Sequence, residues 1–156
     1  MRKEDVAPNL SSLAFDFFFW FSRFEFALKE NVYLKSHNVG ANADPGWEDF
    51  TNRWEGEYTA SADALALLAA KPEQQIVAAN DELSWRAIDL TDCKSELAKV
   101  VRLLKTVRNN LFHGGKHGGA GWDDPKRTEV LLLSGKAVLD ELAQLASLEA
   151  DYTQYY

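Results

Sequence analysis

The sequence predicts an all-α protein with one domain spanning residues 1–156. Apolar residues recur at spacings of three and four along most of the chain, which is the period of a helix buried on one face. Hydrophobic residues make up 46% of the chain, enough for one sizeable core. No internal repeat or low-complexity tract divides it. These observations favour a single helical domain.

The first helix is predicted from Asn9, as its N-cap, to about Lys35. Aromatic residues recur along it at helical spacing: Phe15, Phe18, Phe19 and Phe26. A second set points in other directions around the axis: Phe17, Trp20, Phe21 and Phe24. A helix that is apolar around most of its circumference needs cover on more than one face. Either it lies at the centre of the core, or a second subunit covers it in a homodimer.

The middle third of the chain is less regular. Residues 37–46 are rich in Asn, Gly and Asp-Pro-Gly and predict a loop. Two shorter helices are expected at 47–56 and 61–70, and Lys71-Pro72 ends the second. Residues 73–90 fit either a short helix after Pro72 or extended, irregular chain, so no assignment is made there.

A strong helix is predicted from a cap at Thr91 or Asp92 to about Phe112. Glu96 lies early in it and basic residues lie late, as the helix dipole favours. Gly114 and Gly115 end this helix, because glycine readily adopts the left-handed conformation that closes a helix.

The last helix is predicted from Asp124, a cap, and Pro125, a first-turn residue, to about Glu149. A restart at Ser134 is the alternative, because Gly135 weakens the helix there. The Tyr-rich tail that follows, residues 151–156, is expected to be frayed.

The helix before the glycine pair separates into two faces on a helical wheel. Its buried stripe is predicted to hold Leu97, Val100, Leu104, Val107 and Leu111. The opposite face holds Arg102, Lys105, Asn109 and His113. Asn109 and His113 are four residues apart, so the amide can steer the imidazole or share a ligand with it.

Arg108 lies at the edge of the apolar stripe, about 140° around an unbroken helix from His113. The two side chains converge only if the helix loosens at Phe112, if the arginine stem curls round, or if a second subunit brings both pairs into one cleft. A purely structural interpretation remains open. In it Arg108 pairs with an acid such as Glu25, and His113 only caps the helix.

Charge is distributed unevenly. The chain carries a net charge of -7, which by itself argues against a nucleic-acid partner. The segment from Lys99 to Arg127 nevertheless holds seven basic residues and two acidic ones. The sequence therefore predicts an acidic body with one basic face, unless these are ordinary solvated helix charges.

The sequence places the protein in the cytoplasm. Cys93 is the single cysteine, which excludes an internal disulfide and predicts a small buried hydrophobe. Charged residues interrupt the aromatic run near the N-terminus, so no membrane span is expected, and no signal peptide is recognised. His113 and His117 have a metal-ligand spacing, but Gly114-Gly115 breaks the helical register between them. No metal and no cofactor are expected.

Residues 107–116 read Val-Arg-Asn-Asn-Leu-Phe-His-Gly-Gly-Lys, and this stretch resembles the signature helix of the HEPN superfamily (higher eukaryotes and prokaryotes nucleotide-binding domains). Residues 23–29 are similar to the first long helix of bacterial members. The resemblance implies an up-and-down bundle of four to six helices that commonly dimerises, with two Arg-x4-His segments lining a shared cleft. Active members are metal-independent ribonucleases, many of them toxins or phage-defence proteins.

Roles follow from the resemblance for the matching positions. Arg108 holds the scissile phosphate, His113 moves protons, and Asn109 orients His113 or the phosphate. The 2′-hydroxyl of RNA is then the nucleophile, and the products are a 2′,3′-cyclic phosphate and a 5′-hydroxyl. Other basic residues are candidates for binding flanking phosphates: Arg102, Lys105, Lys116 and His117.

One departure from the family pattern concerns regulation. Toxins paired with nucleotidyltransferase antitoxins resemble Arg-x4-His-x-Tyr, whereas residue 115 here is glycine. Regulation through that tyrosine is not expected, and the sequence does not identify an antitoxin or effector partner. The alternative function is a catalytically inactive HEPN-like dimer that binds nucleotide, RNA or a protein.

Overall fold

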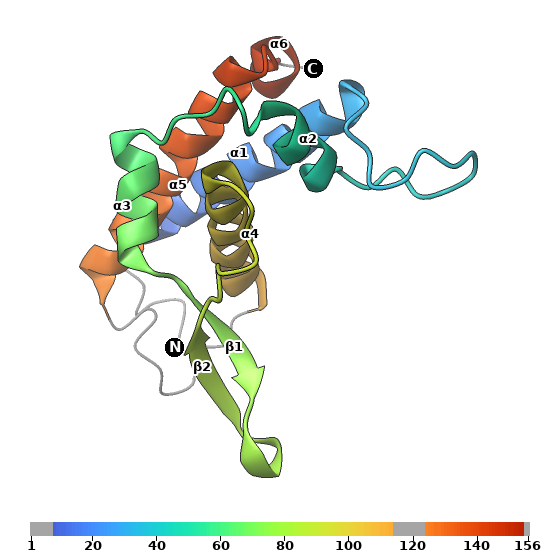
Figure 1. Ribbon diagram of the computed structural model, residues 1–156. Coiled ribbons are helices and arrows are strands. Elements are labelled where there is room, and N and C mark those ends of the chain that lie inside the picture. The colour runs from blue at the N-terminus through green and yellow to red at the C-terminus, as the bar shows by residue number, and fades with distance from the viewer. Residues whose placement is uncertain (1–7, 114–123, 155–156) are drawn as a thin grey trace.

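The computed structural model describes residues 8–113 and 124–154, with only the backbone of residue 113. Within these residues it contains the helices α1 (Pro8–Glu30), α2 (Trp47–Trp54), α3 (Ala62–Ala70), α4 (Glu96–His113), α5 (Pro125–Leu145) and α6 (Glu149–Thr153). Two short strands, β1 (Glu73–Val77) and β2 (Leu83–Ala87), lie between α3 and α4. The mostly helical class is confirmed, and the strands are an addition to the predicted all-α architecture (Figure 1).

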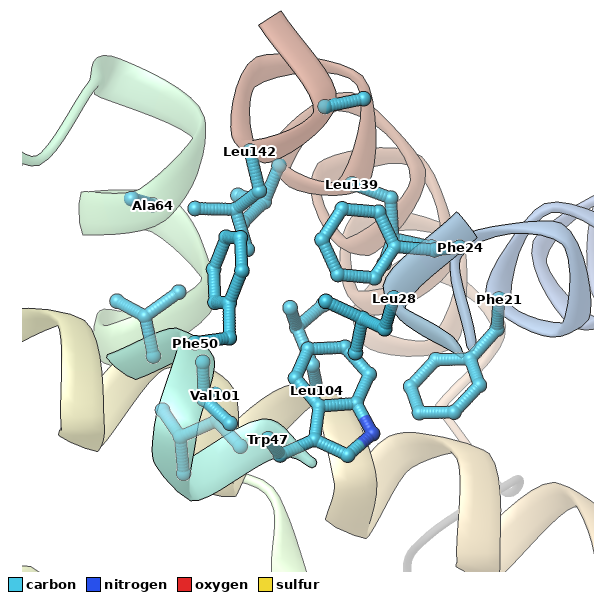
Figure 2. Close-up of a cluster of buried hydrophobic side chains, with 14 of the residues drawn as sticks. Phe21, Phe24, Leu28, Trp47, Phe50, Ala64, Val101, Leu104, Leu139 and Leu142 are labelled. Carbon is cyan, nitrogen blue, oxygen red and sulfur yellow. The ribbon is translucent and has the colours of Figure 1, made fainter. Parts of the chain in front are cut away.

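The two longest helices, α1 and α5, pack against each other, and α3 lies along the other side of α5 (Figure 1). The short helix α6 returns onto α1, while α4 contacts α1, α2, α3 and α5. A contiguous core lies between these helices, and Figure 2 shows how α1, α2, α4 and α5 contribute to it. It includes Phe24, Trp47, Phe50, Leu104 and Leu139.

The buried side of α1 differs from the stripe that recurrent spacing suggested. Phe17, Phe21 and Phe24 are buried in the core, whereas Phe15 is 67% exposed and Phe19 is 45% exposed. With aromatic residues around most of the helix, the pattern alone does not identify the face that packs on α5. The described residues therefore leave Phe15 and Phe19 of α1 uncovered.

Helix α5 is continuous through Gly135, so the alternative restart at Ser134 is wrong. Gly135 is buried where α5 crosses α1, and a Cβ atom there would lie 2.7 Å from Cε2 of Phe17. The absence of a side chain therefore permits the close approach of the two helices.

Gly135→Ala is expected to lower the free energy of unfolding by about 1–3 kcal/mol, because Phe17 must move within a packed core. Urea denaturation monitored by circular dichroism measures this change. Gly56→Ala is the matched control, because a Cβ atom at that position meets nothing within 4 Å. Equal stability of the two variants would contradict the proposed role of Gly135.

Several predicted helix ends require correction. Helix α1 ends at Glu30 rather than near Lys35, because Val32 adopts a left-handed φ of 64°. Helix α4 begins after Ser95, whose hydroxyl accepts a hydrogen bond from the Ala98 N–H at 3.2 Å. The C-terminal segment is not frayed throughout, since Tyr152 lies in α6 and is only 3% exposed.

Strands β1 and β2 form an antiparallel hairpin that projects from the helices near the C-terminal end of α4 (Figure 1). The register pairs Glu73 with Ala87 at the base and Val77 with Leu83 near the turn. Asn80 and Asp81 in the turn both have positive φ, a conformation that these residue types tolerate and that suits tight hairpins.

Candidate functional site

The sequence-predicted site residues lie on α4, and the burial of this helix follows the predicted wheel. Leu97, Val100, Leu104 and Val107 are buried, while Leu111 is partly buried. Lys105 and Asn109 are exposed, one turn apart. The helix continues through His113, so the idea that it loosens at Phe112 to unite Arg108 with His113 is wrong. The side chain of His113 lies outside the described residues.

Arg108 occupies an unusual environment at the edge of the core. Its guanidinium carbon lies 5.8 Å from the ring centre of Phe21 and 5.4 Å from that of Phe112. Nη1 donates a hydrogen bond to Oδ1 of Asn109 at 3.0 Å. Nε is buried and has no hydrogen-bond partner among the described residues. Within residues 8–113 and 124–154, nothing replaces the water that this donor has lost, and a buried donor in that state is costly until an acceptor binds it.

Glu25, the acid considered as a partner for Arg108, forms a hydrogen bond with another residue. Glu25 accepts a hydrogen bond from the indole N–H of Trp47 at 3.0 Å. No salt bridge of Arg108 occurs within residues 8–113 and 124–154. The charge of this guanidinium is therefore not neutralised by the described part of the protein.

The other arginines on the described helices are bound within the fold. Arg23 donates to backbone carbonyls in α6, Arg53 pairs with Glu57, and Arg102 pairs with Asp92. Arg127 donates to the carbonyls of Ala70, at 3.1 Å, and Lys71, at 2.7 Å. Arg108 differs from these four because its hydrogen bond goes to the side chain of its own neighbour.

An aromatic patch adjoins Arg108, and we define it by the exposed rings of Phe15, Phe19 and Phe112 together with the half-buried ring of Phe18. The ring centres of Phe18 and Phe112 are 5.3 Å apart, which links α1 to the end of α4. Phe15 and Phe19 stack at 6.4 Å on the same side of α1. Phe112 is 60% exposed. Grouped, exposed rings of this kind are typical of an interaction surface.

The residues predicted to bind flanking phosphates differ in whether their charges are already paired within the protein. Arg102 donates to both carboxylate oxygens of Asp92 and to the Asp89 carbonyl, so its charge is already compensated. Lys105 is exposed, and together with Arg102 it lines a groove of about 450 Å³ between α2 and α4. Lys116 and His117 lie outside the described residues. Lys105 thus lies one helical turn from Asn109 with its side chain exposed. Arg102 is instead hydrogen-bonded to Asp92, which precedes α4.

The groove between α2 and α4 carries mixed charge. Three acidic residues, Glu48, Glu55 and Asp92, line it beside three basic ones, Lys94, Arg102 and Lys105. Cys93 also lines it and is half-buried, whereas the sequence suggested a buried residue. Asp92 offsets the charge of Arg102, so the predicted basic face is weaker than the count of basic residues indicated. Arg127 keeps its charge, but its donors are occupied by the carbonyls of Ala70 and Lys71.

Acidification is expected to release Arg102 from Asp92. Hydrogen bonding by Arg102 holds the pKa of Asp92 below its ordinary value of 3.8, so the folded state binds this proton less tightly than the unfolded state does. The stabilisation is therefore present above pH 3.8 and is lost as the pH falls through the lowered pKa. An NMR titration of the Asp92 carboxyl carbon measures this. Arg102→Ala should return the pKa toward 3.8, and an unchanged pKa in that variant would contradict the assignment.

Asn110 is a residue whose role the sequence did not reveal. Its side-chain N–H donates to the backbone carbonyl of Glu73 at 2.7 Å, which fixes the base of the hairpin to α4. The partner lies 37 residues away along the chain, so no local pattern points to it. Of the two consecutive asparagines, Asn109 is exposed beside Arg108 and Asn110 is structural.

The described residues contain no group of three or more His, Cys, Asp or Glu side chains arranged to hold a metal ion. Within the same ranges, no helix has both the length and the apolar character needed to cross a bilayer.

No protein-family model, curated protein or solved structure matches this chain.

Proposed function

We propose that this chain is a metal-independent endoribonuclease of the HEPN type that acts as a homodimer in the cytoplasm, with a toxin or phage-defence role as its setting. The observation that carries the proposal is the state of Arg108 among the described residues: a guanidinium with no ion pair and a buried Nε with no hydrogen-bond partner, beside Asn109 and one helical turn before Phe112. A phosphate would supply the missing acceptor and the missing negative charge.

The chemistry requires three groups at the end of α4. Arg108 would bind the scissile phosphate and stabilise the charge that develops on it. Asn109, already bonded to Arg108, would keep the guanidinium in place or contact the phosphate. His113 would transfer protons, and the negative end of the helix dipole favours its protonated form. Attack by the RNA 2′-hydroxyl would give a 2′,3′-cyclic phosphate.

A second subunit provides the simplest way to combine Arg108 with His113. With α4 helical through residue 113, the two positions lie on different faces of one helix. The aromatic patch adjoins Arg108 through Phe112 and would be buried in a symmetric interface. Each cleft would then receive its arginine and its histidine from different subunits.

Phe15→Glu is expected to convert the dimer into a monomer, because a carboxylate would be buried in the interface that the aromatic patch forms. Analytical ultracentrifugation measures the change in mass. Val39→Glu is the control, since Val39 is fully exposed in the loop between α1 and α2. A monomeric wild-type chain, or a Phe15→Glu variant that remains dimeric, would contradict the predicted interface.

The second candidate is an inactive HEPN-like dimer that binds nucleotide, RNA or a protein partner. The observation that favours it is the binding of Arg102 to Asp92 and of Arg127 to backbone carbonyls, because neither guanidinium is then free to bind the phosphates of a long RNA.

Incubation of labelled RNA with the protein in excess chelator distinguishes the two candidates. The ribonuclease proposal predicts fragments with 2′,3′-cyclic phosphate ends that disappear in His113→Ala. Intact RNA with the wild-type chain, or equal cleavage by His113→Ala, would leave the binding function as the better account.

A further inference from the structure

Within the described residues, the guanidinium of Arg108 lies against aromatic rings and forms no salt bridge. Its carbon lies over the ring of Phe21, 5.8 Å from the centre, and over the ring of Phe112, 5.4 Å from the centre. Both distances are within the limit of a cation–π interaction, about 6 Å. The two rings thus take the place that a carboxylate takes beside Arg53 and Arg102.

Helix α1 fixes both of these rings. Phe21, on α1 itself, is 2% exposed, and its ring centre lies 5.4 Å from that of Trp47 in the core. Phe18 lies one turn earlier on the same face of α1, with its ring centre 5.3 Å from that of Phe112. Phe112 lies one turn beyond Arg108 on α4. The core therefore holds one ring, and α1 supports the other.

A ring face suits an arginine that must bind an anion. The face of an aromatic ring attracts a cation but does not neutralise it. A carboxylate partner would compete with a phosphate for the same donors. An arginine that is already held in place also loses less side-chain entropy when an anion binds. The rings therefore order the Arg108 side chain and leave its charge available.

We propose that Phe112 and Phe21 are positioning residues that hold the Arg108 guanidinium in the orientation that binds the scissile phosphate. This inference rests on the proposed ribonuclease function and extends it to the side chains behind the arginine. Asn109 fixes one nitrogen of the guanidinium, Nη1, through its hydrogen bond at 3.0 Å, and the two rings restrain the rest of the group.

Phe112→Leu tests the proposal, because leucine keeps an apolar side chain in the aromatic patch but offers no ring face to a cation. Phe112 is 60% exposed, so the core is left intact. The NMR order parameter of the Arg108 Nε–H bond, measured on the full chain, reports how firmly the guanidinium is held. It should be close to the rigid value of about 0.85 in the wild type and fall below about 0.6 in Phe112→Leu.

Two further variants complete this measurement. Phe112→Tyr keeps the ring and should retain the wild-type order parameter of Arg108. Phe26→Leu is the matched control, because it removes a ring that lies 4.8 Å from the guanidinium carbon of another arginine, Arg23. It should leave the order parameter of Arg108 unchanged.

Cleavage kinetics provide the second readout. Because Phe112 acts through the orientation of Arg108, Phe112→Leu should lower kcat about tenfold and change the KM for RNA less than about threefold. Phe112→Tyr should restore kcat to within about threefold of wild type, since the ring is present again.

The Phe15→Glu background separates the effect of the ring from that of the dimer interface. The proposal expects Phe112→Leu to lower the order parameter of Arg108 in this background as well as in the wild-type chain. A loss confined to the wild-type chain would overturn the proposal, since the interface would then be what holds the arginine. A mobile Nε–H bond in the wild type would also overturn it, as would an unchanged order parameter in Phe112→Leu.

The two readouts also separate this inference from the proposed function. RNA cleavage by the wild type with an order parameter that does not depend on Phe112 rejects the positioning role alone. An order parameter that falls in Phe112→Leu, in a protein whose wild type cleaves no RNA, rejects the ribonuclease function alone and leaves the rings as the support of an anion-binding arginine.

Discussion

Arg108→Ala is expected to reduce RNA cleavage by about a hundredfold to a thousandfold, the loss typical of removing one preorganised donor to a developing charge. The free energy of unfolding should change by no more than about 1 kcal/mol, because the side chain forms no ion pair within the described structure and bonds only to Asn109. Initial cleavage rates in excess chelator, together with urea denaturation, measure the two quantities.

Two further variants sharpen this result. Arg108→Lys keeps the positive charge but loses the planar fork of donors, so it should restore only part of the rate. Arg53→Ala is the matched control, since Arg53 is also a helical arginine and pairs with Glu57 at an exposed position. Wild-type cleavage by Arg108→Ala, or loss of activity in Arg53→Ala as well, would contradict the role of Arg108.

Phe24→Ala is expected to lower the free energy of unfolding by about 3–5 kcal/mol, a large part of the stability of a domain this size. Phe24 is completely buried, and its ring contacts those of Trp47, Phe50 and Tyr152 at 5.1, 5.5 and 6.1 Å. Its removal would therefore loosen the contacts of α1 with α2, which Figure 2 shows, and with α6. Urea denaturation measures the loss.

Phe19→Ala provides the comparison, because Phe19 lies on the same helix with 45% of its surface exposed. In the monomeric Phe15→Glu background it should cost less than about 1 kcal/mol, since less apolar surface returns to water. Similar losses for Phe19→Ala and Phe24→Ala would mean that the core lies on a different face of α1.

The sequence predicts much of the helical framework because helices leave local signals. Helix α4 separates its apolar and polar faces as the wheel requires, and Asp124 caps α5 by accepting the N–H groups of Lys126 and Arg127. The hairpin leaves a weak signal, because β1 begins with Glu73, Gln74 and Gln75 rather than an apolar alternation. Its attachment depends on contacts between distant segments.

The candidate site was predictable to a similar extent. The spacing of Arg108, Asn109 and His113 places them at the end of one helix, and α4 does extend to residue 113. The sequence could not predict which basic side chains are free to bind a ligand. Arg102 and Arg127 resemble free cations in the sequence, but Arg102 binds Asp92 and Arg127 binds carbonyls more than 50 residues away. Long-range hydrogen bonds therefore decide which cations can meet a ligand.

Subunit mixing tests most directly whether Arg108 and His113 act together across a dimer interface. Arg108→Ala and His113→Ala chains are each expected to be inactive alone. After subunit exchange, each mixed dimer would contain one cleft with both native residues, so an equal mixture should recover up to about a quarter of wild-type cleavage. A mixture no more active than its separate components, under conditions where exchange is demonstrated, would contradict the shared site.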